Sequence, residues 1–362
     1  MEHPFAGRRF LIAAGSVVLV SALAGAWIGL RIGGARVTLW VDDVLTPLAA
    51  LIACVLCFCA RARHSGRMRL FWSLLAAATA CWTLAECIWG YYALILSVTV
   101  PVPSWADVGY LSAIPLAVAA LLVHPATLGS RMRKARSVFD GLVIATALLF
   151  LSWTLVLGSL WRSADLSTLA GVVNLAYPFG DVVIVFFIVL AIRGMTGQGR
   201  LSLWCLLGAL LVMAVSDSTF TYLTEVVNYT TPNLIDAGWV AAYLGIAVAA
   251  FSSQPADAVV VARAEQSTPS LTSLIAPLLP VLLALSVAAV EIRLGHHLDR
   301  AAWLMAFALI ALVLARQGLM VLELLTPSRD RHLGLMQRLT QAALDNEGPE
   351  KGPASAYRAD RY

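Results

Sequence analysis

Long apolar blocks recur along the chain, and they constrain its fold more than any other feature of the sequence. Two of them are FLIAAGSVVLVSALAGAWIGL, which begins at Phe10, and FDGLVIATALLFLSWTLVLGSL, which begins at Phe139. Each is close to the length of about 20 residues that an α-helix needs to cross a bilayer. A helix at the surface of a soluble domain has a polar outer face, and these blocks have none. The sequence therefore predicts an all-α, polytopic helical membrane protein.

The composition agrees with this fold class. Charged residues make up 13% of the chain, whereas an ordinary globular domain has about 25%. We expect about ten transmembrane helices. The predicted spans are 10–30, 40–60, 70–90, 107–123, 139–160, 172–192, 201–222, 235–251, 273–290 and 301–324.

The distribution of arginine predicts the orientation of these spans. The loops 61–69 and 126–138 are strongly basic, so both are expected in the cytoplasm. Alternation then places the N- and C-termini in the cytoplasm, in a multi-pass protein of the plasma membrane. The first span also resembles a signal peptide, because SALAGA offers an A-x-A cleavage site. Its apolar region is long for a signal peptide, which favours an uncleaved anchor.

An internal repeat is visible in the stretches PSWADVGYLSAIP and PNLIDAGWVAAYL. Their alignment pairs Asp107 with Asp236. The preceding helices repeat as well and pair Glu86 with Asp217, at an offset of about 130 residues. This offset covers four predicted spans, so both copies run in the same direction across the membrane. The sequence thus predicts a parallel internal repeat of four-helix units.

Two roles are compatible with these acids. Asp107, Asp236 and Asp43 begin predicted helices, where a carboxylate caps free N–H groups and favours the positive end of the helix dipole. Glu86 and Asp217 lie near predicted helix C-termini, where a negative charge is disfavoured. Capping therefore explains the first three acids and not the last two.

A further acid, Asp181, lies well inside a predicted span in the segment NLAYPFGDVVIVFF. Pro178 and Gly180 precede it, and we expect them to break the helix. Acids inside a membrane are costly and indicate function, so we predict an outward-facing pocket for a ligand or a cation. Aromatic residues at this depth belong either to an interfacial belt or to the walls of a cation site. The candidate pocket residues are Glu86, Asp181, Asp217, Asp107, Asp236, Trp82 and Tyr177.

Six cysteines raise the question of a metal site, because three of them crowd the segment CVLCFC just before His64. Small apolar packing residues near a helix end are the favoured interpretation of Cys54, Cys57 and Cys59. We therefore expect no metal and no cofactor.

Several segments are similar to a known family. PSWADVGYLSAIPLAVAALL, VFDGLVIATALLFLSW, NLAYPFGDVVIVFF and DAGWVAAYLGIAVAA resemble the multi-span membrane region at the N-terminus of actinobacterial GGDEF/EAL signalling proteins. The resemblance covers roughly 66–325 and implies a sensor region. The residues that match by motif are Asp107, Asp140, Pro178, Asp181, Asp217 and Asp236.

The sequence departs from that family after the last span, because no GGDEF or EAL string follows. Walker, HExxH and nucleophile-elbow motifs are also missing from it. We therefore expect an integral membrane sensor-like signalling protein without a catalytic output domain, and not an enzyme. A small-solute or cation transporter is the first alternative, and a lipid-modifying membrane enzyme is the second.

The predicted organisation has six parts. They are an N-terminal two-span hairpin (1–65), a six-span region with the repeated helix pairs (66–251), a cytoplasmic linker (252–272), a C-terminal span pair (273–325), a cytoplasmic amphipathic helix (326–346) and a disordered tail (347–362). The expected partners are the lipid bilayer and, through 330–346, a second copy or a cytoplasmic signalling protein. We expect no nucleic acid.

Overall fold

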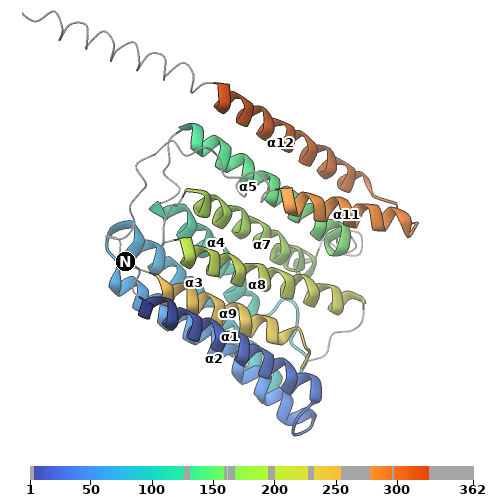
Figure 1. The fold of residues 1–362 in the computed structure, drawn as a ribbon. Coiled ribbons are helices and arrows are strands. Elements are labelled where there is room, and N and C mark those ends of the chain that lie inside the picture. The colour runs from blue at the N-terminus through green and yellow to red at the C-terminus, as the bar shows by residue number, and fades with distance from the viewer. Residues whose placement is uncertain are drawn as a thin grey trace, which may run out of the picture. The chain divides into compact units, whose positions relative to one another are not determined.

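The structure, a computed structural model, describes residues 4–125, 131–158, 161, 168–194, 200–226, 232–253, 278–295 and 297–325. Every regular element in these ranges is a helix, so the predicted all-α class is confirmed (Figure 1). The elements are α1 (Pro4–Leu30), α2 (Ala35–Arg63), α3 (Gly66–Gly90), η1 (Tyr91–Ile95), α4 (Trp105–Val123), α5 (Arg131–Ser152), η3 (Trp153–Leu157), α7 (Leu169–Gly194), α8 (Arg200–Val226), α9 (Asp236–Ser252), α11 (Leu279–Arg293) and α12 (Arg300–Leu325).

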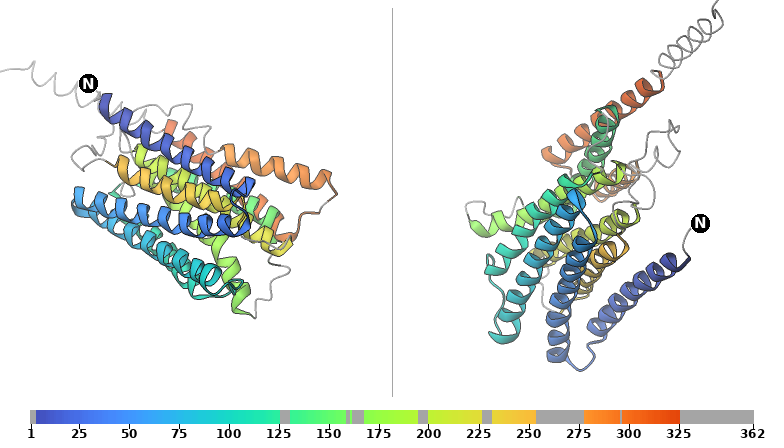
Figure 2. Two further views of the ribbon diagram at one scale, coloured as in Figure 1. Left: turned by 90° about the horizontal axis from the view of Figure 1, so that it is seen from below. Right: turned by 90° about the vertical axis from the view of Figure 1, so that its left-hand side faces the viewer.

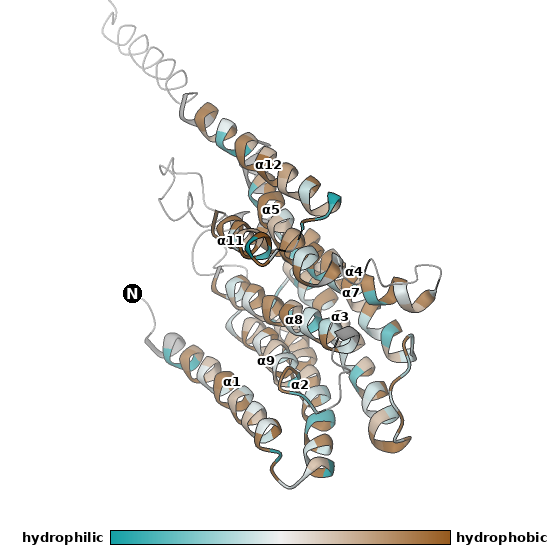
Figure 3. Ribbon diagram, turned by 90° about the vertical axis from the view of Figure 1, so that its right-hand side faces the viewer, coloured by the Kyte–Doolittle hydropathy of each residue, from teal (hydrophilic) through white to brown (hydrophobic). Residues whose placement is uncertain are grey.

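Eight of the described helices are long and apolar enough to cross a bilayer. Apolar residues run along the length of these helices, as Figure 3 shows. The chain is therefore a polytopic helical membrane protein. Helix α9, with 17 residues, and the described part of α11, with 15, are shorter. The count of ten spans, their orientation and the location of the termini stay predictions.

Six helices form a closed ring in which each packs against its two neighbours, in the order α2, α3, α4, α7, α8, α9 and back to α2 (Figures 1 and 2). We call α2–α4 the first unit and α7–α9 the second unit. Helix α1 lies outside the ring along α9, and α5 lies outside it along α7. The two-span hairpin predicted for 1–65 stays a prediction. Helix α2 belongs to the ring, where its face of small residues is buried.

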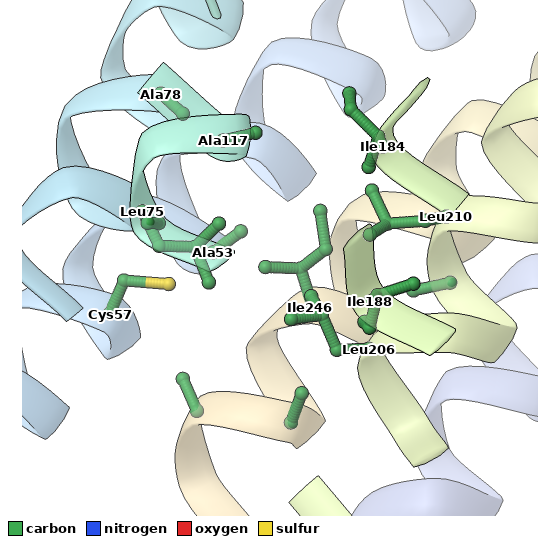
Figure 4. Close-up of a cluster of buried hydrophobic side chains, with 14 of the residues drawn as sticks. Ala53, Cys57, Leu75, Ala78, Ala117, Ile184, Ile188, Leu206, Leu210 and Ile246 are labelled. Atoms are coloured by element: carbon green, nitrogen blue, oxygen red, sulfur yellow. The ribbon is translucent and has the colours of Figure 1, made fainter. Parts of the chain in front are cut away.

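The two units pack together through a core of unequal side chains (Figure 4). The first unit presents small residues such as Ala53, Ala78 and Ala117, all of them buried. Both units also present larger side chains, such as Leu75 of the first unit and Ile188 of the second. Small residues let neighbouring helices approach closely, which is how membrane helices gain packing energy where no hydrophobic effect drives them together.

A second apolar cluster lies around α5, α11 and the beginning of α12, with Val143, Ala284 and Leu309 among its buried members. Leu148 of α5 packs against both clusters. Helix α5 therefore connects the ring with the helices beyond it.

Two arginines donate hydrogen bonds to the C-terminal ends of neighbouring helices. Arg63 donates from Nη2 to the carbonyl of Ala250 at 2.7 Å, and Arg67 donates from Nε to the carbonyl of Val123 at 3.0 Å. The last carbonyls of a helix have no partner within that helix. Each arginine thus satisfies one of them, on α9 and on α4 respectively.

Packing divides the chain into two parts, Met1–Val313 and Leu314–Tyr362. In the second part the structure describes the continuation of α12 to Leu325. The predicted amphipathic helix, the predicted tail and most of the predicted linker lie outside the described residues.

Candidate ligand cavity

The ring encloses a cavity of about 110 Å³, to which each of its six helices contributes. Its walls carry six carboxyl groups, those of Asp42, Asp43, Glu86, Asp107, Asp217 and Asp236. They also carry six aromatic rings, those of Trp89, Tyr110, Tyr177, Phe220, Trp239 and Tyr243. Among the described residues that line this cavity, which we call the acidic cavity, none is a lysine or an arginine.

Asp107 and Asp236 occupy equivalent positions in the two units. The backbone N–H of Ser104 donates to Oδ2 of Asp107 at 2.5 Å, and that of Asn233 donates to Oδ2 of Asp236 at 2.6 Å. Both acids therefore accept from the residue three positions earlier, as the acid of a capping box does. Each acid lies inside its helix, so the prediction that they are the N-caps themselves is wrong; in α4 the N-cap is Ser104.

Asp43 was also expected at a helix start, and this prediction is wrong. Helix α2 begins at Ala35, after Gly33 and Gly34 turn the chain with φ of 83° and 84°. Asp43 consequently lies in the third turn, buried beside Asp42. The start was misplaced because the apolar run before Asp43 continues the helix backwards to the glycine pair.

Hydroxyl and indole groups orient three of the carboxyl groups. The Tyr243 hydroxyl donates to Oε1 of Glu86 at 2.8 Å, which joins α9 of the second unit to α3 of the first. The indole N–H of Trp239 donates to Oδ1 of Asp217 at 2.6 Å, within the second unit.

The Tyr177 hydroxyl donates to Oδ1 of Asp107 at 2.5 Å, which joins α7 to α4. Two tyrosine–carboxyl hydrogen bonds thus join the units, and the one between Tyr177 and Asp107 lies at the α4–α7 junction.

Two carboxyl groups on α2 are only partly satisfied. Asp42 shares a side-chain hydrogen bond with Asp236, and a bond between two carboxyl groups requires one of them to carry a proton. Oδ1 of Asp42 and Oδ2 of Asp43 are buried and accept no hydrogen bond. A buried polar group without a partner costs about 1–3 kcal/mol, so these two oxygens are available to a donor that enters the cavity.

Asp181 does not line the acidic cavity. With Pro178 it lines a second, wider cavity of about 1120 Å³, which extends between α5, α7, α8 and α11. We call this the lateral cavity. The sequence placed Asp181 together with Glu86 because both are intramembrane acids, but their side chains point to different sides of the ring.

The break expected at Pro178 and Gly180 is absent, because α7 continues through both. Proline removes one hydrogen bond, and packing against neighbouring helices keeps such a helix continuous. A Cβ on Gly180 would meet the side chain of Ile114 in α4, so this glycine serves close packing. Trp82 is buried behind the cavity, with its ring centroid 6.0 Å from that of Tyr243.

The sequence contains a signal for the contribution of α2 to the acidic cavity, which the predicted repeat does not include. Pro47 and Pro178 are 131 residues apart, as Glu86 and Asp217 are. Extending the repeat by one helix aligns α2 with α7 and brings Asp43 opposite Asn174, which also lines the acidic cavity.

Equivalent close contacts support this longer repeat. A Cβ on Gly109 would meet Ala85 of α3, and a Cβ on Gly238 would meet Ser216 of α8. Ala85 and Ser216 are themselves 131 residues apart.

The described residues contain no group of three or more His, Cys, Asp or Glu side chains arranged to hold a metal ion. Cys54, Cys57 and Cys59 are free thiols on α2, and Cys57 is buried in the core of the ring. Comparisons with protein-family models, with curated proteins and with solved structures found no match to this chain.

Proposed function

We propose that this protein is a membrane sensor whose acidic cavity binds a small solute, and whose response passes through α5 to α12. The cavity carries the proposal: six carboxyl groups from both units converge on one enclosed space with no basic residue among its described lining. Intramembrane acids are costly, and a group of them around a cavity is typical of a ligand or ion site.

Packing contacts define the proposed route from the acidic cavity through α5 to α12. Helix α5 lies against α7 of the ring, and Leu148 belongs to the surroundings of both apolar clusters. The indole of Trp153, which follows α5, donates to Asp299 at 3.0 Å, and Asp299 accepts from the backbone N–H of Ala302 at the start of α12. A shift of α7 on ligand binding would therefore move the start of α12.

Helix α12 has 26 residues, which exceeds the ~20 needed to span a bilayer. The resemblance of 66–325 to the membrane region of GGDEF/EAL signalling proteins supports the same role. In those proteins the equivalent helix leads to a catalytic domain. We propose that residues 330–346 contact a partner.

Transport of a small solute or cation is the second candidate, and the closed ring of two equivalent three-helix units favours it. Parallel repeats with a site between them are one of the architectures of secondary transporters. Movement of one unit against the other would open the acidic cavity to each side of the membrane in turn.

Thermal melting of the full chain in lipid nanodiscs tests both candidates. The melting temperature is measured with each member of a panel of small amines, neutral solutes and inorganic cations. A sensor is expected to be stabilised by at least one compound. It should show slower hydrogen exchange in α5 and at the start of α12, and it should not carry that compound into proteoliposomes. Uptake into proteoliposomes contradicts the sensor and favours the transporter. Melting temperatures unmoved by the whole panel contradict both.

A further inference from the structure

One end of the acidic cavity is aromatic. Phe220 of α8 packs edge-to-face between Trp89 of α3 and Trp239 of α9, with ring centroids 6.0 Å and 5.7 Å apart. All three rings line the cavity. Aromatic faces attract cations through the ring quadrupole, and they accept the alkyl groups of an organic cation at the same time.

The wall contributed by α2 supplies unused acceptors. The Asp42 side chain is 4% exposed, lines the cavity, and leaves its Oδ1 without a hydrogen-bond partner. Oδ2 of the neighbouring Asp43 is also buried without a hydrogen-bond partner. A ligand that donates hydrogen bonds to these oxygens removes the penalty of burying them unpaired.

The size of the cavity limits the ligand. One water occupies about 10–15 Å³ of such a volume, so 110 Å³ has room for on the order of ten waters, which suits a small organic molecule.

We infer that the acidic cavity binds a small protonated amine, whose N–H groups donate to Asp42 and Asp43 and whose alkyl part contacts the Trp89–Phe220–Trp239 cluster. This inference rests on the proposed function in one respect, that the cavity is a ligand site. It adds the chemical class, a primary or secondary ammonium ion. Bare inorganic cations have no alkyl part to contact the aromatic end, and neutral alcohols bring no charge to the carboxyl groups.

Butylammonium is the probe, and 1-butanol is its neutral counterpart of the same length. Titration calorimetry on the full chain in nanodiscs should show saturable binding of butylammonium and at least tenfold weaker binding of 1-butanol, Na⁺ and Ca²⁺. Tetramethylammonium, which has the charge and no N–H, should also bind at least tenfold more weakly. Equal binding of 1-butanol, tighter binding of either metal ion, or no binding of butylammonium would overturn the inference.

Asp42→Asn and Asp43→Asn locate the site. Each is expected to weaken butylammonium binding at least tenfold, because an amide replaces one acceptor oxygen with an N–H donor. Glu291→Gln is the matched control, an acid of α11 that lines the lateral cavity, and it should leave the affinity unchanged within a factor of two. Trp239→Phe provides a second variant should either aspartate variant fail to fold, and it should also weaken binding. Unchanged affinity in folded Asp42→Asn and Asp43→Asn, or in Trp239→Phe, contradicts the assignment.

The two proposals fail in different ways. If a neutral solute or an inorganic ion stabilises the protein and amines do not, the ligand class is wrong while a ligand-binding sensor remains. If butylammonium binds and is carried across proteoliposome membranes, the ligand class holds and the sensor role fails.

Discussion

The two junctions between the units occupy equivalent places in the ring but differ in chemistry. Where α4 meets α7, Asp107 accepts from the Tyr177 hydroxyl, and Ile114 packs against Gly180. Where α9 meets α2, Asp236 meets the carboxyl group of Asp42.

The chemistry of the two junctions differs because α2 has no tyrosine at the position equivalent to Tyr177 of α7. Thr46 is the α2 residue equivalent to Tyr177, and its hydroxyl donates to the carbonyl of Asp42, one turn back in its own helix. The α4–α7 junction is therefore satisfied by the protein alone, whereas the α9–α2 junction leaves carboxyl oxygens for something else. The proposed amine site therefore lies at the junction that lacks the tyrosine hydroxyl.

The largest expected effect comes from glycines that hold each unit together. A Cβ at Gly109 would lie 2.9 Å from the backbone carbonyl oxygen of Cys81, which cannot move without shifting α3. At the equivalent Gly238, the added Cβ would meet the Ser216 hydroxyl, which can rotate. Overpacking typically lowers the free energy of unfolding by about 1–3 kcal/mol. We expect a loss near the upper limit for Gly109→Ala and near the lower limit for Gly238→Ala.

Melting of both variants in the same detergent checks this difference. Ser216→Ala combined with Gly238→Ala should recover most of the smaller loss. If Gly238→Ala is the more damaging of the two, the units are not packed as described.

An intermediate effect is expected at the bridge between the units. Tyr243→Phe removes the hydroxyl that donates to buried Glu86 and leaves the ring in place. Leaving a buried acceptor without its donor costs about 1–3 kcal/mol, so the melting temperature should fall. The position equivalent to Tyr243 in the first unit is Ile114, and Ile114→Val should cost less, about 0.5–1.5 kcal/mol. An equal loss in both variants would mean that the Tyr243 hydroxyl does not hold the units together.

The smallest effect concerns the ends of α4 and α9, where His124 and Ser253 are the respective C-caps. Burial lowers the pKa of His124 to about 4, from about 6.5 when unfolded. The unfolded chain therefore binds more protons than the folded chain between these values, and stability falls as the pH drops through this range. From pH 7 to 6 the loss should be under about 1 kcal/mol by this linkage.

Melting temperatures at several pH values should show a shallower decline in His124→Gln than in the original chain. Ser253→Ala, at the equivalent position, should leave the slope unchanged. An unaltered slope in His124→Gln would mean that the histidine is not kept neutral by burial.

The fold class and the approximate positions of the helices could be predicted from the sequence, because the thickness of the bilayer and the length of each apolar segment determine them. The pairing of Asp107 with Asp236 was also visible, because the repeat preserves acid, glycine and aromatic together. The placement of Asp181 could not be predicted, because the depth of a residue in the membrane does not indicate which side of its helix faces the cavity. The role of Asp42 was missed for a related reason: it belongs to α2, whose approach to α9 joins residues almost 200 positions apart.

The fastening of α9 by Arg63 has a consequence for biosynthesis. Arg67 can engage α4 as soon as residues up to Val123 have emerged, but Arg63 must wait until Ala250 is made. At about 5–20 residues per second, that interval lasts on the order of 6–25 seconds. During this time Asp42 and Asp43 of α2 lack α9 as a neighbour, and Arg63 lies at the end of α2 to which α9 later binds.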